Sequence, residues 1–154
     1  MNINTVGLIE IDGRILYVYY SLDKPFFKAS NVGLILGYDD ENLSELLKMC
    51  EEDEKMLLPI VVNNQKCYVD FITENGLYNI LSQSRKPFAR KWRRMIHDQI
   101  IDLRKEHDMT VIELFEIWEE RLANIYYDEE TGILMRSVTV EGGDVIQIPF
   151  DGEL

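Results

Sequence analysis

The sequence predicts an α+β fold: a single domain of β-hairpins packed with four or five helices, with a C-terminal β-hairpin extension. Two observations support this class. Runs rich in β-branched and aromatic residues flank turn-forming residue pairs, which is the pattern of hairpins. Between these runs, apolar residues recur at helical spacing. The chain of 154 residues is long enough to bury a core without disulfides or metals.

Two turn-forming pairs mark hairpins in the first half of the chain. Asp12–Gly13 separates TVGLIEI from RILYVYY, and Asn63–Asn64 separates MLLPIVV from QKCYVDF. These residue types adopt the left-handed backbone that two-residue hairpin turns require. Pro25 opens a further extended piece that includes FF. We therefore expect strands on both sides of each turn.

Helical signals lie between and after these hairpins. Ser30 can cap a short helix over residues 31–36, which Gly37 ends. Apolar residues recur at helical spacing in 43–50 and again in 77–81. A longer helix is expected from Pro87 to about Lys105. Proline is favoured at the first position of a helix, because the backbone N–H that it lacks would have no helical partner there.

The C-terminal third predicts one more helix and a last hairpin. Thr110 and Glu113 have the spacing of a capping box, so a helix is expected from residue 110 to about Tyr126. Strands are expected near 133–140 and 145–150, with the two glycines at 142 and 143 in the turn.

Composition indicates an intracellular protein. No run of 18 apolar residues is present, so no membrane span is expected. The N-terminus lacks the basic start and long apolar stretch of a signal peptide. Two cysteines, Cys50 and Cys67, cannot form a disulfide framework and are expected to be buried fillers.

Charge is distributed very unevenly along the chain, whose net charge is −12. Residues 85–105 hold 8 basic and 2 acidic residues, a net charge of +6, whereas residues 106–154 carry −11 and residues 1–84 carry −7. Such asymmetry indicates an electrostatic role for the basic stretch.

A helical projection separates the stretch after Pro87 into two faces. The face expected to be buried holds Phe88, Trp92, Met95, Ile96, Gln99 and Leu103. The opposite face holds the candidate nucleic-acid-binding residues Lys86, Arg90, Arg93, Arg94, His97 and Arg104, with Lys105 beside them. This face is expected to be solvated.

The basic face admits three explanations. It can be an ordinary solvated face, or it can pair with the acidic runs DDENLSE and EEDEK, in surface ion pairs of about 0–1 kcal/mol each. It can also bind phosphates. Five of the eight basic residues in 85–105 are arginine, which is the preferred residue for bidentate phosphate recognition.

The sequence offers no convergent catalytic group. The histidines, His97 and His107, have no nucleophile motif nearby, and their spacing from Cys50 and Cys67 matches no zinc-binding pattern. The glycines of NVGLILG lack the third glycine and preceding strand of a dinucleotide loop. We therefore expect no enzymatic activity, no metal site and no cofactor.

The helix after Thr110 carries more apolar surface than one buried face needs. Ile112 and Ile117 widen a stripe that includes Phe115 and Trp118. Two explanations stay open: a helix wedged between the main body and the last hairpin, or a homodimer interface built on these four residues.

Two motifs resemble a known family. FFKASNVGLILGYDD resembles an aromatic pair before a helix that ends in Leu-Gly-Tyr, and ENGLYNILSQSRKPFARKWRRMI resembles a Gly-Leu-Tyr, Ser-Arg-Lys-Pro, Ala and Trp pattern. Their order and spacing are similar to the BRO N-terminal domain (Bro-N) of large DNA viruses and bacteriophages. The resemblance covers about residues 5–109 and leaves 110–154 as a helix and hairpin extension, packed on the same domain or forming a dimer interface.

The resemblance implies two functions. The first is a viral or phage nucleic-acid-binding regulator that contacts phosphates, most simply those of duplex DNA, through the basic face between Lys86 and Lys105. The alternative is an antirepressor-like or host-factor-binding module whose acidic surface engages a regulatory protein without binding DNA. Both place the protein in the cytoplasm or nucleus of an infected host cell.

Overall fold

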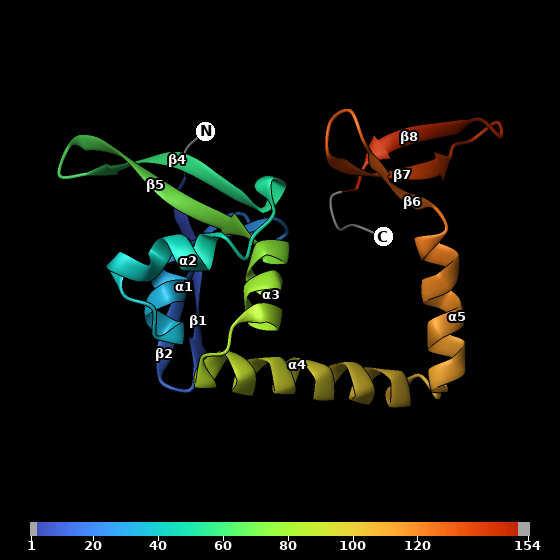
Figure 1. Cartoon of the computed structure of the whole chain (residues 1–154), viewed down its shortest axis with the longest axis horizontal. Helices are drawn as coiled ribbons and strands as arrows, with labels where there is room; N and C mark the ends of the chain where they lie inside the picture. Colours follow the sequence, from blue (N-terminus) through green and yellow to red (C-terminus); the bar gives the residue numbers. More distant parts are fainter. Residues whose placement is uncertain (1–2, 151–154) are drawn as a thin grey trace. The chain divides into compact units, whose positions relative to one another are not determined.

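The computed structural model describes residues 3–150 and confirms the α+β class. The chain divides into two compact units, Met1–Ile96 and His97–Leu154 (Figure 1). No helix in the described part of the chain combines the length and the apolar character that crossing a membrane requires.

The first unit contains a five-stranded antiparallel sheet with strand order β1-β2-β3-β5-β4. Its strands are β1 (Thr5–Ile11), β2 (Arg14–Tyr20), β3 (Pro25–Lys28), β4 (Lys55–Val62) and β5 (Gln65–Thr73). Both predicted hairpin turns are confirmed, because Asp12, Asn63 and Asn64 have positive φ angles of 51°, 51° and 61°.

The helices of the first unit are α1 (Ala29–Leu36), α2 (Leu43–Leu47), α3 (Glu74–Gln83) and the start of α4 (Pro87–Glu106), with 3₁₀ turns η1 (Asp40–Asn42) and η2 (Glu52–Glu54). Gly37 ends α1 with a φ of 98°, as predicted. The predicted cap is wrong: Ser30 lies inside α1, whose N-cap position is Lys28, because β3 runs directly into the helix.

The side chain of Asn31 makes hydrogen bonds to β2 where the short strand β3 ends. At this point the amide of Asn31 replaces the backbone of a neighbouring strand. Its Oδ1 accepts from the backbone N–H of Tyr17 at 2.9 Å, and its Nδ2 donates to the carbonyl of Ile15 at 3.0 Å. The edge of β2 is thus satisfied without a longer β3.

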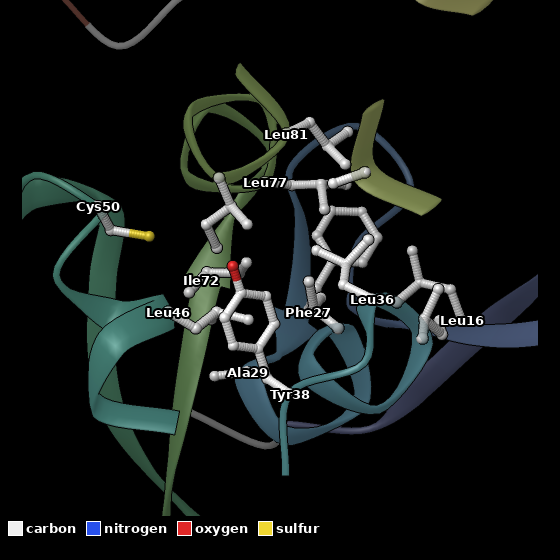
Figure 2. Packing of buried hydrophobic residues seen from close by; sticks show 14 of the residues in the cluster. Leu16, Phe27, Ala29, Leu36, Tyr38, Leu46, Cys50, Ile72, Leu77 and Leu81 are labelled. Atoms are coloured by element: carbon white, nitrogen blue, oxygen red, sulfur yellow. The ribbon is translucent and has the colours of Figure 1, made fainter. Parts of the chain in front are cut away.

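The core lies between the sheet and helices α1, α2 and α3. Figure 2 shows Leu16, Phe27 and Ile72 of the sheet packed with Leu36, Leu46 and Leu77 of the helices. Neighbouring strand residues face opposite sides of a sheet. Phe71, next to Ile72, is therefore buried on the other face of the sheet. The centroid of its ring lies 5.1 Å from the ring centroid of Tyr19.

The two thiols differ in burial. Cys50 is buried in the core, as predicted, and burial raises its pKa to about 11. Cys67 lies exposed on β5, so the prediction of a buried filler is wrong for it.

Gly76 sits where α3 meets η2, and this contact excludes any side chain. A Cβ at this position would lie 2.9 Å from the backbone oxygen of Glu54. In an open helix, Gly→Ala usually stabilises by up to about 1 kcal/mol. Here we expect Gly76→Ala to destabilise by about 1–2 kcal/mol in urea unfolding, because the overlap must be relieved by moving backbone.

Ser82→Ala, at an exposed position of the same helix, is the matched control for Gly76→Ala and should stay within about 0.5 kcal/mol of wild type. A rise in stability for Gly76→Ala would show that the space above the glycine is open.

The second unit contains the end of α4, helix α5 (Val111–Leu122) and a three-stranded antiparallel sheet of order β6-β7-β8. Its strands are β6 (Ile125–Asp128), β7 (Ile133–Thr139) and β8 (Val145–Pro149). The predicted capping box is confirmed, since Thr110 Oγ1 accepts from Glu113 N at 3.2 Å. The predicted helix end is wrong: Tyr126 belongs to β6, which was not expected.

The second unit has almost no interior of its own. Between residues 97 and 150 no side chain is fully buried. Large apolar side chains are exposed on α4, α5 and the sheet, among them Ile100, Leu103, Ile112, Phe115 and Leu122. The expectation that Leu103 is buried is therefore wrong.

Candidate nucleic-acid interface

The segment between α3 and α4 is fixed by Ser84. This serine is fully buried, and its hydroxyl lies 2.7 Å from the hydroxyl of Tyr38 in a hydrogen bond. The same oxygen accepts from the backbone N–H of Lys86 at 3.3 Å. Figure 2 shows the Tyr38 hydroxyl directed into the packed cluster. Ser84 thus sets where α4 begins, and with it the direction of the basic residues that follow.

Arg93 stabilises the junction between α3 and α4. Its Nη1 donates to the carbonyls of Leu81 at 2.6 Å, Ser82 at 3.1 Å and Ser84 at 3.2 Å. These carbonyls lie at the C-terminal end of α3, where the last turn has no helical partners of its own. A cation is also favoured at this negative end of the helix dipole. Arg93 is half-buried, so its predicted place on a solvated face is wrong.

The buried face of α4 is centred near Ala89, which explains the position of Arg93. Ala89 is fully buried, and Phe88, Trp92 and Ile96 pack against the core beside it. Met95 and Gln99, expected to be buried, are exposed. The helical projection placed the buried face by its large apolar residues. The small residue Ala89 instead marks where the helix lies closest to the core.

Three basic residues follow one another at intervals of one helical turn at the start of α4. Lys86, Arg90 and Arg94 are four residues apart, so they share one side of the helix. Arg90 and Arg94 are exposed. Lys86 is half-buried, with its ammonium 5.0 Å from the ring centroid of Tyr38. We call these three residues the basic row.

Three carboxylates of the acidic runs make contacts away from the basic row. Asp39 accepts from Asn42, Glu52 pairs with Lys55 at 3.1 Å, and both carboxylate oxygens of Glu54 accept from Asn79 at 2.8 Å. Within residues 3–150, neither Lys86 nor Arg90 forms an ion pair with a carboxylate. The explanation by internal ion pairs therefore does not apply to these two cations.

Arg85 and Arg14 were not predicted as binding residues, yet both lie near the start of α4. Arg85 is exposed in the turn before Pro87. The guanidinium carbon of Arg14, on the β1–β2 hairpin, lies 4.0 Å from the ring centroid of Phe88. Arg85 belongs to the Ser-Arg-Lys-Pro motif, which was a signal for it. The approach of Arg14 to Phe88, more than 70 residues away in the chain, leaves no trace in the sequence.

The turn of the β1–β2 hairpin also contacts Lys91 of α4. Its Nζ lies 2.8 Å from Oδ2 of Asp12, and this hydrogen bond and charge hold the pKa of Asp12 below its ordinary value, with a smaller effect from Arg14. Asp12 is thus partnered with a lysine outside the basic row. The hairpin turn and the start of α4 are held together by these contacts.

The other candidate residues belong to the second unit. His97 and Lys105 are exposed on α4. Arg104 is half-buried, and its Nη1 donates to the carbonyl of Met109 at 2.8 Å, which closes the C-terminal end of the helix. Phosphate contacts by these three residues stay predictions.

Among the described residues, one group of side chains is close enough to hold a metal ion: Glu51, Asp53 and Glu54 of the η2 turn. Glu54 is already engaged, because its carboxylate accepts from Asn79 and from the backbone N–H of Glu51. This acidic turn is explained by its local hydrogen bonds.

Comparison with known proteins relates this part of the chain to one family. The family model of the BRO family, N-terminal domain, matches residues 15–102, which include the whole junction and most of α4. Protein 201R of Invertebrate iridescent virus 6, whose name describes a Bro-N domain, is 25% identical over 141 residues, covering 78% of this chain and 34% of that protein. This chain therefore spans about a third of the length of that relative.

No solved structure matches the chain. The family match covers more than half of the sequence and contains the Ser-Arg-Lys-Pro segment that sets the start of α4. The chain belongs to the BRO family, through its N-terminal domain, Bro-N.

Proposed function

We propose that this protein is a viral nucleic-acid-binding regulator that contacts duplex DNA through the start of α4. The observation that carries the proposal is the basic row, Lys86, Arg90 and Arg94, together with the exposed Arg85. Arginines in such a row can donate two hydrogen bonds each to phosphate oxygens. The viral relative and the regulatory roles associated with the family support this function, and the family is not known for enzymatic activity.

The acidic remainder of the chain limits the strength of this binding. With a net charge of −12, the chain as a whole repels a polyanion, so contact is favoured where basic side chains gather, at the start of α4. Phosphate contacts fix position and orientation but carry little sequence information. We therefore propose moderate affinity with little dependence on DNA sequence.

The salt dependence of binding tests this function. Four phosphate contacts should give a slope of log K against log salt of about −3.6, at about 0.9 per contact. Fluorescence anisotropy of a labelled duplex, titrated at several salt concentrations, measures the slope. Two duplexes of unrelated sequence should give the same value.

The absence of binding at tens of micromolar protein in low salt would contradict the proposal. The function would then be that of the alternative, a module that engages a regulatory protein. A slope near zero with tight binding would also contradict it, because affinity would then come from contacts other than phosphates.

A further inference from the structure

The carboxylate of Asp12 lies at the tip of the β1–β2 hairpin and pairs with two cations. Its Oδ2 is 2.8 Å from Nζ of Lys91 on α4 and 3.6 Å from Nη1 of Arg14. All three side chains are at least 43% exposed, so a ligand in solution can reach them. The hydrogen bond and charge of Lys91 hold the pKa of Asp12 below its ordinary value, so the carboxylate is ionised at neutral pH.

The geometry of the hairpin turn does not explain this negative charge. Asp12 has a φ of 51°, and asparagine suits this left-handed conformation at least as well as aspartate. In the β4–β5 hairpin of the same sheet, the neutral Asn63 opens the turn with the same φ of 51°. An ion pair with Lys91 also contributes little to stability, because both side chains stay in water. The charge of Asp12 therefore has its main effect on the cations beside it.

These two cations adjoin the basic row. Lys91 is three residues before Arg94, and side chains three residues apart are neighbours on a helix surface. Arg14 reaches the same helix from the hairpin, with its guanidinium carbon 4.0 Å from the ring centroid of Phe88. All of these residues belong to the first unit. A polyanion bound at the basic row therefore comes close to two further cations, and both are paired with Asp12.

We propose that the carboxylate of Asp12 occupies a phosphate position of the DNA-binding surface, and that a DNA phosphate displaces it from Lys91 and Arg14. The inference rests on the proposed function and extends the contact surface from α4 to the tip of the hairpin. Carboxylates and phosphates both accept hydrogen bonds from ammonium and guanidinium groups, so they compete for the same donors. Displacement leaves a negative charge beside the polyanion. Asp12 thus acts as an intramolecular competitor that lowers the affinity of the chain for DNA.

Asp12→Asn tests this inference, because the variant removes the charge and keeps a residue that suits the turn. In anisotropy titrations with a labelled duplex, its affinity should be about tenfold higher than that of wild type at about 50 mM salt. The slope of log K against log salt should become steeper by about 0.9, the value of one further phosphate contact. Asp12→Asn/Lys91→Ala should lose most of this gain, because the released Lys91 supplies the new contact.

Asp23→Asn is the matched control for the change of net charge. Asp23 is exposed in the loop that follows β2, at the end of this strand opposite to the hairpin turn. The seven residues of β2 span about 23 Å, which exceeds the screening length of roughly 10–15 Å at this salt concentration. The affinity of Asp23→Asn should therefore differ from that of wild type by less than about twofold.

The outcomes separate this inference from the proposed function. If wild type binds, equal affinities of Asp12→Asn and Asp23→Asn overturn the inference and leave the proposed function intact. A gain that persists in full in Asp12→Asn/Lys91→Ala also overturns it, because the new contact would then not come from Lys91. If neither wild type nor Asp12→Asn binds the duplex at tens of micromolar protein in low salt, the proposed function is contradicted, and this inference with it.

Discussion

Replacing Arg90 and Arg94 by alanine is expected to weaken duplex binding roughly 100-fold at low salt. Each arginine is exposed on the same side of α4, one turn apart, and can donate charged hydrogen bonds to a phosphate. Such bonds contribute about 1.5–3 kcal/mol each, and about 1.4 kcal/mol corresponds to a tenfold change. The slope against salt should become shallower by about 1.8.

Two controls separate this effect from a general change of charge. Lys48→Ala/Lys66→Ala removes two exposed positive charges outside α4 and should change the affinity only slightly. Arg90→Lys/Arg94→Lys keeps the charges and should retain the slope while losing bidentate contacts. If Arg90→Ala/Arg94→Ala binds as wild type does, the basic row is not the interface.

Arg93→Ala is expected to lower the free energy of unfolding by about 3 kcal/mol. Three carbonyls, of Leu81, Ser82 and Ser84, lose a charged donor at the end of α3. The side chain is half-buried, so water replaces these bonds only in part. Urea unfolding followed by circular dichroism measures the change.

Arg90→Ala provides the matched control for Arg93→Ala, because it removes the same side chain three residues away at an exposed position. It should change stability by less than about 0.5 kcal/mol. Arg93→Lys should recover only part of the loss, since an ammonium lacks the planar fork of a guanidinium. Equal stability of Arg93→Ala and Arg90→Ala would show that the junction does not depend on Arg93.

These two predictions separate residues that the sequence alone treats alike. Arg90 and Arg93 lie in one basic run, and a helical projection assigns both to a solvated face. The difference arises because α3 ends beside α4, and its open carbonyls lie within reach of one arginine. The projection contains no information on what surrounds a helix.

The sequence by itself determined the local elements of this protein. The turns at Asp12 and Asn63, the start of α4 at Pro87 and the capping box of Thr110 follow from backbone preferences of single residues. The two motifs also identified the family. These features depend on neighbours within a few residues, so their signals are contained in short segments.

Only the tertiary structure decided which side chains are buried and which cations are engaged. Ala89 became the centre of a buried face, Asn31 completed the edge of β2, and Arg93 closed the end of α3. The sequence predicted the end of α5 too late for the same reason. Residues whose own pattern is helical form strand β6, because they pair with β7. Each outcome depends on contacts between segments distant in sequence, whose free energy outweighs local preference.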